Sequence, residues 1–272
     1  MQKRIFMSKL TLVSTGAGGS RYLTQEAIDA INEADLIVAY TKYAKDLPHL
    51  VADKEVFTTP MTKEIERVQY AIDEAKKGRR VALLSNGDAN VYAMGSLVVE
   101  LLDTLDLWDE IEYSALPGIS SVLALASEVG APLSQDFCLI SLSDRLTDAQ
   151  LIQKRIYNAL DSDMVIAIYN PKSRSRLAPY EGMLEQLQKL EKERIVVIAR
   201  DLGRANQMIK IISSAELIEA GVQNEDVNMS TTLLIGNSTT KLTKDGRVLT
   251  PRGYLNKYDL SGAEKGEWQK IN

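Results

Sequence analysis

The chain has 272 residues, of which 45% are hydrophobic and 25% charged, values close to those of soluble globular proteins. This length suits one large α/β unit or two domains and excludes a small disulfide scaffold, whereas the composition excludes a mainly disordered chain. Because 32 Lys and Arg face 37 Asp and Glu, the net charge is −5, and we expect no nucleic-acid partner and no anionic membrane surface as a partner.

The sequence shows no membrane span or signal peptide, and together with its single cysteine this predicts a cytoplasmic protein. The longest apolar run, Met164–Tyr169, is far shorter than the roughly 20 residues that span a bilayer. Lys3 and Arg4 precede a stretch that Ser8 interrupts, which argues against a signal peptide. The single cysteine, Cys138, lies in an apolar segment and is predicted to be a buried, inert thiol in a reducing compartment.

Short apolar clusters alternate with longer amphipathic stretches, which is typical of strands alternating with helices in open sheets. Helices are expected between the strands, one capped by Thr24 and another over Ile65–Ala75 that ends at Gly78. The predicted strands are Leu10–Val13, Leu36–Tyr40, Val81–Leu84, Ile111–Tyr113, Phe137–Leu142, Met164–Tyr169, Ile195–Ala199, Met208–Ile212 and Thr232–Ile235.

The predicted fold is therefore α/β, with two α/β domains that carry open sheets. A strand gives way to a Pro-Gly turn near Ala115–Gly118, and this is the expected boundary. The expected domains are residues 1–115 and 116–254, followed by a tail over 255–272. The polar segment 241–272 is expected to be irregular, with its last residues mobile.

The first candidate site is the glycine-rich segment Ser14–Ser20, which follows a strand. Its glycines let the backbone approach a ligand and expose N–H groups. Arg21 stands where a dinucleotide fingerprint needs its third glycine, so an NAD site is disfavoured. A plain tight turn is the alternative.

Two further loops follow strands. Ser85–Tyr92 lies where ligands gather in open α/β sheets, although Asp88 or Asn90 could instead cap the next helix, which runs to about Leu102. Leu116–Ser121 is a turn whose serines could cap a helix or reach a ligand.

A basic segment follows the strand that ends at Tyr169. Lys172, Arg174 and Arg176 lie within five residues of one another in an otherwise acidic protein. They are expected to bind carboxylates or phosphates, and the alternative is a solvated loop.

Conventional catalytic sets are absent from the sequence. The only histidine, His49, follows Pro48 in what reads as a surface loop, and no Cys/His cluster or Walker loop is present. No metal is expected. An enzyme built from this chain would depend on positioning and on a reactive cofactor, and S-adenosylmethionine fits because its sulfonium is an activated methyl donor.

Taken together in chain order, these loops and turns resemble those of the tetrapyrrole (corrin and porphyrin) methylases. The resemblance is strongest to the precorrin-3B or cobalt-factor III C17-methyltransferases of cobalamin synthesis. The resemblance covers about residues 8 to 254. It rests on Ser14–Gly18 with Leu23-Thr24, Gly87–Ala89, Pro117–Ser121, Gly130–Leu133, Ile140–Asp144, Tyr169–Arg174, Gly236–Thr240 and Thr250–Tyr254. Three residues depart from the family pattern: Ser14 and Ala89 replace a glycine and a proline, and Ala17 replaces another proline.

The resemblance implies methylation of C17 with ring contraction, a homodimer, and a cofactor cleft between the two domains. Implied cofactor residues are Ala17, Gly87, Asp88, Val91, Ser120, Ser121, Asn170, Leu202 and Thr231. Implied or charge-matched substrate residues are Ser14, Thr15, Lys172, Arg174 and Arg176, with Asp144 and Tyr92 as candidates for proton transfer during ring contraction.

Three alternatives stay open at this stage. The substrate could be the precorrin or its cobalt-containing counterpart, since nothing in the sequence separates them. The chain could also bind cofactor or tetrapyrrole without turnover, or methylate RNA or protein, although its acidity disfavours RNA.

Overall fold

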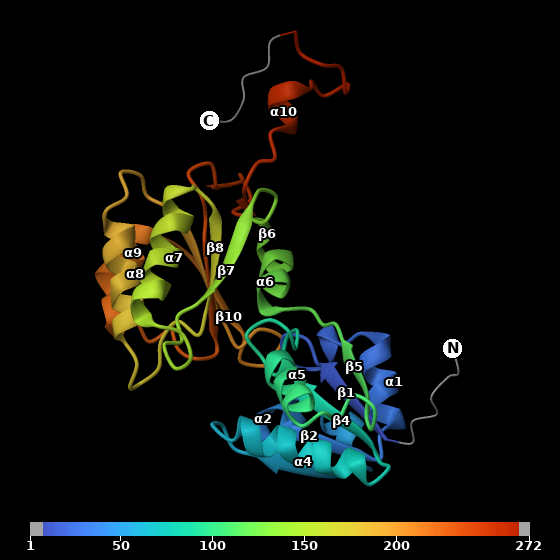
Figure 1. The fold of residues 1–272 in the computed structure, drawn as a ribbon. Coiled ribbons are helices and arrows are strands. Elements are labelled where there is room, and N and C mark those ends of the chain that lie inside the picture. The colour runs from blue at the N-terminus through green and yellow to red at the C-terminus, as the bar shows by residue number, and fades with distance from the viewer. Residues whose placement is uncertain (1–7, 267–272) are drawn as a thin grey trace. The chain divides into compact units, whose positions relative to one another are not determined.

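The computed structural model describes residues 8–266, so Lys3, Arg4 and the last residues of the tail lie outside the described part (Figure 1). These residues form two compact units. Unit 1 comprises residues 8–124 and Asp201–Gln207, and unit 2 comprises Leu125–Arg200 and residues 208–266. The division lies at Ala124, past the turn at which we placed the boundary, and 201–207 joins unit 1 although its flanking strands belong to unit 2.

Unit 1 is built on a parallel five-stranded sheet. Its order is β3-β2-β4-β1-β5, so β4, β1 and β5 are neighbours and their carboxyl ends meet at one edge. The strands are β1 (Lys9–Ser14), β2 (Leu36–Tyr40), β3 (Glu55–Thr59), β4 (Arg80–Ser85) and β5 (Glu112–Leu116).

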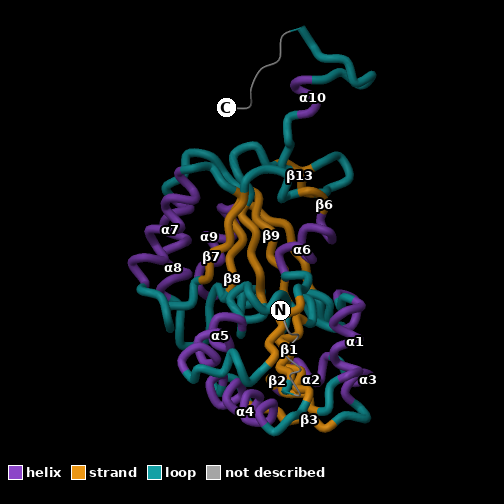
Figure 2. Tube along the Cα trace, turned by 45° about the vertical axis from the view of Figure 1, so that its right-hand side comes forward, coloured by secondary structure: helices purple, strands orange, loops and turns teal. Residues whose placement is uncertain are grey.

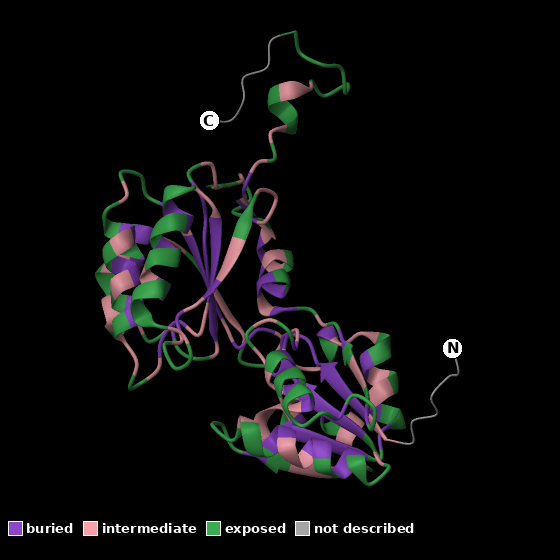
Figure 3. Cartoon of the chain, in the orientation of Figure 1, coloured by how far each residue is buried: buried purple, intermediate pink, exposed green. Residues whose placement is uncertain are grey.

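Both faces of this sheet are covered, because its central strands are apolar on both sides. Leu36 and Val38 pack in one core cluster with residues of α4 and α5, whereas Ile37 and Ala39 pack in another with residues of α1. Figure 3 shows these strands as buried. The helices are α1 (Gln25–Glu33), α2 (Thr41–Asp46), α3 (Pro48–Val51), α4 (Glu64–Lys76) and α5 (Gly95–Thr104), with a 3-10 turn η1 (Ser20–Tyr22).

Unit 2 has a mixed five-stranded sheet in the order β10-β9-β11-β8-β7, in which only β7 and β8 are parallel. Its strands fan out in Figure 2, and α7, α8 and α9 supply residues to the core cluster that they share. The elements are β7 (Phe137–Ser141), α7 (Ala149–Asp161), β8 (Val165–Tyr169), α8 (Ala178–Gln188), β9 (Ile195–Arg200), β10 (Met208–Ser213), α9 (Ser214–Ala220), η2 (Gly221–Gln223) and β11 (Thr231–Ile235).

The remaining elements are short. Helix α6 (Ser121–Val129) runs across the division between the units. A small sheet joins β12 (Lys241–Leu242), β13 (Val248–Leu249) and β6 (Gly130–Ala131), and α10 (Tyr254–Lys257) follows. Our expectation that the segment from Lys241 onward is irregular was therefore wrong for these elements, because β13 pairs with a segment more than 110 residues earlier, which no local pattern reveals.

All predicted strands are confirmed to within a few residues, as are the Thr24 cap of α1 and the end of α4 before Gly78. Helix α5 begins at Gly95, and its N-cap residue Met94 makes no side-chain hydrogen bond. The alternative in which Asp88 or Asn90 caps this helix is therefore wrong. Within residues 8–266, no helix combines the length and the apolar character needed to cross a membrane.

Candidate functional site

Three strand-end loops of unit 1 are bonded to one another at the carboxyl edge of its sheet. The loop after β1 meets the loop after β4 through a reciprocal backbone pair: Gly16 N donates to Gly87 O at 3.1 Å, and Gly87 N donates to Gly16 O at 2.7 Å. One residue earlier, Thr15 donates to Ser85 O from its backbone nitrogen at 2.8 Å and from its hydroxyl at 3.2 Å. These bonds make the two glycine-rich segments one structural element.

Ser14 adds a side-chain link between the same two loops. It is 1% exposed, and its Oγ accepts a hydrogen bond from Ala89 N at 2.8 Å. Ser14 therefore contacts the β4 loop from within the protein, and its buried hydroxyl does not face solvent. The proposed contact of Ser14 with substrate stays a prediction.

Asp88 links the β4 loop to the turn after β5. Its Oδ1 accepts from Asn90 N at 2.8 Å, and its Oδ2 accepts from Gly118 N at 3.0 Å. The first bond closes a local turn, whereas the second spans 30 residues of sequence. A carboxylate that is bound by two backbone N–H groups holds both loops in one arrangement.

The glycines of these loops differ in what surrounds them. A Cβ at Gly118 would lie 2.4 Å from Gly87 O and 2.5 Å from Ser14 Cβ, so only glycine fits there. At Gly87, where φ is +67°, a Cβ would find only Ser120 nearby, with its Cα at 3.9 Å. Gly118 therefore serves loop packing, whereas Gly87 is favoured by its left-handed φ, and its N and O are both bonded to Gly16.

The other predicted cofactor residues of unit 1 lie around these loops. Ala17, Leu202 and Ser120 are buried, and Val91 and Ser121 are half-buried. Leu202 belongs to the segment 201–207, whose backbone approaches the β1 loop so closely that a Cβ at Gly18 would lie 2.6 Å from Leu202 O.

Tyr92 is half-exposed and adopts a positive φ of 53°. A bulky side chain in the left-handed region costs free energy, on the order of 1–3 kcal/mol, and such strain is concentrated at functional sites.

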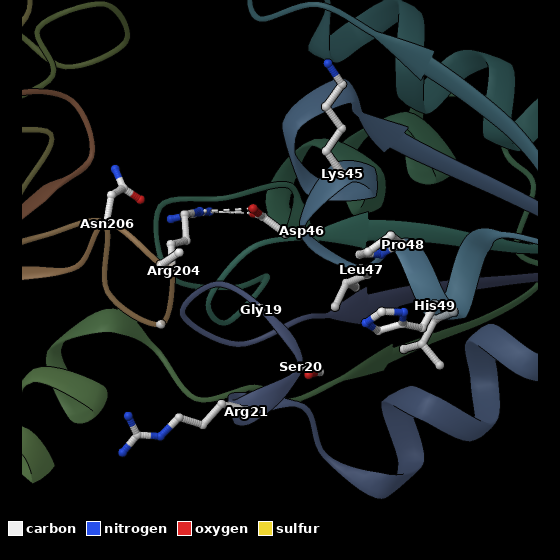
Figure 4. Close-up of a pocket in the computed structure, with 13 residues that line it drawn as sticks. Gly19, Ser20, Arg21, Lys45, Asp46, Leu47, Pro48, His49, Arg204 and Asn206 are labelled. Atoms are coloured by element: carbon white, nitrogen blue, oxygen red, sulfur yellow. Dashed lines mark hydrogen bonds and ion pairs between the residues drawn. The ribbon is translucent and has the colours of Figure 1, made fainter.

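Segment 201–207 is fastened to α2 by two ion pairs that the sequence analysis missed. Arg204 Nη2 lies 2.7 Å from Asp46 Oδ2, and Lys42 Nζ lies 3.4 Å from Asp201 Oδ1. An open pocket of about 530 Å³ adjoins the first pair and is lined by Gly19–Arg21, Lys45–Leu50 and Gly203–Asn206 (Figure 4). Figure 4 shows the side chains of Lys45 and Arg21 extending in different directions, so these cations do not converge on one point.

The basic segment of unit 2 does not form a single charged patch. Lys172 is 7% exposed, and its ammonium donates to Val222 O and to Asn224 O, the latter at 2.7 Å. Burial lowers the pKa of this ammonium. Lys172 therefore stabilises the packing of unit 2, whereas we assigned it to the substrate because its charge alone was visible in the sequence.

The Arg176 side chain is also mostly bonded within unit 2, whereas Arg174 is exposed. The Arg176 guanidinium donates to Leu142 O and to Asn170 O, the latter at 2.9 Å, and its Nε lies 3.8 Å from Asp144 Oδ1. Burial lowers the pKa of Arg176, and Asp144 opposes this effect. Of the three predicted cations, only Arg174 fits the description of an exposed charge.

The two cofactor residues predicted in unit 2 have internal hydrogen bonds. Asn170, with φ of 50°, donates from Nδ2 to Ser141 Oγ at 3.0 Å. Thr231 is buried, and its Oγ1 accepts from Asn228 N at 2.9 Å. Their proposed contacts with a cofactor stay predictions.

The described residues, 8–266, offer neither a metal site nor a reactive thiol. No cluster of three or more His, Cys, Asp or Glu side chains that could hold a metal ion is present in this range. Cys138 is partly buried, and burial raises the pKa of its thiol.

Comparisons with known proteins relate the chain to one family. A family model described as Tetrapyrrole (Corrin/Porphyrin) Methylases matches residues 9–218. The chain is 39% identical over 254 residues to the probable cobalt-factor III C(17)-methyltransferase of Methanocaldococcus jannaschii, a match that covers 92% of this chain and 100% of that protein.

Two further relatives are similar over most of this chain. The cobalamin biosynthesis protein CbiHC of Archaeoglobus fulgidus is 38% identical over 259 residues, which are 95% of this chain and 56% of that longer protein. The crystal structure of the methyltransferase CobJ is 32% identical, with a TM-score of 0.80 over 90% of this chain and 100% of that one.

Proposed function

Because the chain belongs to the tetrapyrrole (corrin/porphyrin) methylase family, we propose that it is an S-adenosylmethionine-dependent C-methyltransferase of cobalamin biosynthesis. Its reaction is methylation of C17 of precorrin-3B or cobalt-factor III, with ring contraction. The observation that carries the proposal is the set of three interlocked strand-end loops in unit 1, the position at which α/β sheets bind ligands.

The residues of these loops fit a cofactor that is bound largely through backbone groups. S-adenosylmethionine supplies a methyl group on a positively charged sulfur. Gly87 adds no side chain to the loop after β4, and Ala17 and Leu202 are buried apolar residues. The proposed cofactor residues of unit 1 are Ala17, Gly87, Asp88, Val91, Ser120, Ser121 and Leu202. Asn170 and Thr231, which belong to unit 2, are proposed on the family resemblance.

The chain contributes to the transfer chiefly by positioning. The bonded loops orient the reactants, and exclusion of water favours a transition state in which the positive charge on sulfur disappears. Tyr92 and Asp144 are the residues we assign to proton movement during ring contraction. The strained, half-exposed Tyr92 supports the first assignment, and the exposed Asp144 beside Arg176 supports the second.

The substrate carries several carboxylates, and we assign the exposed Arg174 to its binding. Contacts of Ser14, Thr15 and Arg176 with the substrate stay predictions, because these side chains are bonded within the protein. We also propose that the protein works as a homodimer in the cytoplasm. The partly buried thiol of Cys138 is consistent with a reducing compartment.

The test is incubation of the protein with S-adenosylmethionine and either precorrin-3B or cobalt-factor III, followed by mass spectrometry. The proposal predicts a gain of one methyl group on one of the two precursors. No gain on either precursor, with folded protein that binds the cofactor, would refute turnover.

A further inference from the structure

Three loops of unit 2 meet at one edge of its sheet. They are the loop after β7 (142–148), the loop after β8 (170–177) and the segment before β11 (226–230). Because β7 runs parallel to β8 and β11 runs antiparallel to it, the ends of β7 and β8 lie at the same edge as the start of β11. Segments that are far apart in the sequence therefore share this edge.

Arg176 bonds the three loops together. Its guanidinium donates to Leu142 O in the loop after β7 and to Asn170 O in its own loop, the latter at 2.9 Å. Its Nη2 also donates to Met229 Sδ at 3.2 Å in the segment before β11, and its Nε lies 3.8 Å from Asp144 Oδ1. The side chain of Arg176 is only 10% exposed, so its charge is used within the protein and holds the loops in one arrangement.

The acidic side chains of these loops have partners within the protein. Asp144 lies beside Arg176, and Asp148 accepts hydrogen bonds from the first turn of α7 as its N-cap. Asp226 pairs with Lys210. These partners offset the negative charge of the loops.

The exposed side chains of the same loops are cationic and apolar. Arg145 and Arg174 are exposed, and neither guanidinium takes part in an ion pair within residues 8–266. Leu146 is fully exposed, and Met229 is 39% exposed. Single exposed leucines are common on protein surfaces, but here apolar side chains accompany unpaired cations on loops that Arg176 holds together.

We propose that the tetrapyrrole binds on these exposed side chains, which we call the Leu146 surface: Arg145, Leu146, Arg174 and Met229. A tetrapyrrole substrate combines a flat apolar ring with carboxylates on its rim. The two apolar side chains contact the face of the ring, and the two guanidinium groups bind the carboxylates, for which their planar fork is suited. This inference rests on the proposed function in naming the ligand of the surface.

The experiment measures binding without turnover. Uroporphyrin, a tetrapyrrole with carboxylates on its rim, is titrated with the protein, and the change in its fluorescence gives the dissociation constant. We expect about 5-fold weaker binding for Leu146→Ser and for Arg145→Gln, with the dissociation constant for S-adenosylmethionine unchanged by both. Unchanged uroporphyrin affinity in either variant would overturn the proposal.

Salt separates the two kinds of contact. The effect of Arg145→Gln should fall below about 2-fold in 1 M NaCl, because salt screens exposed charges, whereas the effect of Leu146→Ser should persist. The matched controls are Arg155→Gln on α7 and Leu260→Ser near the C-terminus, which change an exposed arginine and an exposed leucine outside the three loops. Both controls should bind uroporphyrin as the wild type does, and equal losses in the controls would refute the surface.

Turnover and self-association give separate outcomes. If the wild type binds uroporphyrin but methylates neither precursor, the proposed function fails, and the variants still decide the Leu146 surface. If the wild type methylates a precursor and Leu146→Ser keeps the same KM, the surface is wrong and the proposed function stands. If Leu146→Ser lowers the mass in light scattering and keeps its uroporphyrin affinity, a second copy of the chain covers the surface, which would contradict the proposal.

Discussion

The removal of the Asp88 carboxylate is the most informative single perturbation of the candidate site. Asp88→Ala deletes two hydrogen bonds, from Asn90 N at 2.8 Å and from Gly118 N at 3.0 Å. Hydrogen bonds to charged groups contribute about 1.5–3 kcal/mol each, and Asp88 is only half-buried, so we expect a loss of about 2–3 kcal/mol in the free energy of unfolding.

Asp88→Asn provides a graded comparison. An asparagine keeps one oxygen, which can accept from Asn90 N, but its NH₂ group cannot accept from Gly118 N. We therefore expect a loss of about half that of Asp88→Ala, together with most of its loss of cofactor affinity. The discriminating feature is the bond to Gly118, because it joins two loops.

Urea unfolding, calorimetry and hydrogen exchange over residues 116–121 measure these effects. The Gly118 amide should exchange faster in both variants. The reasoning would be refuted if both variants kept wild-type exchange in this peptide and wild-type cofactor affinity. Loss of stability with unchanged affinity would show that Asp88 serves the fold alone.

Three further predictions follow from charged side chains. Lys172→Met should lower the free energy of unfolding of unit 2 in urea by about 2 kcal/mol, because the carbonyls of Val222 and Asn224 lose their donor. Arg174→Gln, on the exposed surface, should change this free energy by less than about 0.5 kcal/mol, and equal effects of the two variants would contradict the burial of Lys172. Arg174→Gln should instead raise the KM for the tetrapyrrole, most at low salt, without changing cofactor affinity, and an unchanged KM would make Arg174 a solvated charge. Hydrogen bonds from the Arg80 side chain and backbone lower the pKa of Asp35 from 3.8 to about 2. The ionised Asp35 therefore stabilises the folded state above pH 4, and this stabilisation is lost as the pH falls towards 2. Because Asp35 is exposed, the contribution is below about 1 kcal/mol, and the stability difference between the wild type and Asp35→Asn should vanish near pH 2; a constant difference would refute the linkage.

The sequence predicted the elements whose signal is local. β2 is apolar on both faces, and the alternation of Leu36 and Val38 with Ile37 and Ala39 between two cores makes a continuous apolar run. β3 was missed because it is an edge strand, where only Thr59 is buried and Glu55 is exposed. Its composition resembles that of a surface loop.

The candidate site was predictable in its positions and not in its bonds. Glycine spacing after two strands identified Gly16 and Gly87, but their reciprocal pair requires the strand order, which places β1 beside β4. Gly118 and the Arg204–Asp46 ion pair were missed as site residues, because their partners lie 30 and 158 residues away.

Lys172 shows the limit of reading charge from sequence. Three cations in five residues predicted a patch that binds carboxylates or phosphates, yet the Lys172 side chain is buried and its ammonium donates to the carbonyls of Val222 and Asn224. The backbone that it contacts is some 50 residues further along the chain, so no pattern around residue 172 reveals it.

The most direct test of the central claim locates the transferred methyl group. The protein would be incubated with S-adenosylmethionine labelled with ¹³C in its methyl group and with each of the two precursors, and the product would be examined by carbon NMR. The account predicts one enriched methyl carbon, attached to C17 of a ring-contracted macrocycle. An enriched methyl at any other position, or an unlabelled macrocycle recovered with active cofactor binding, would contradict it.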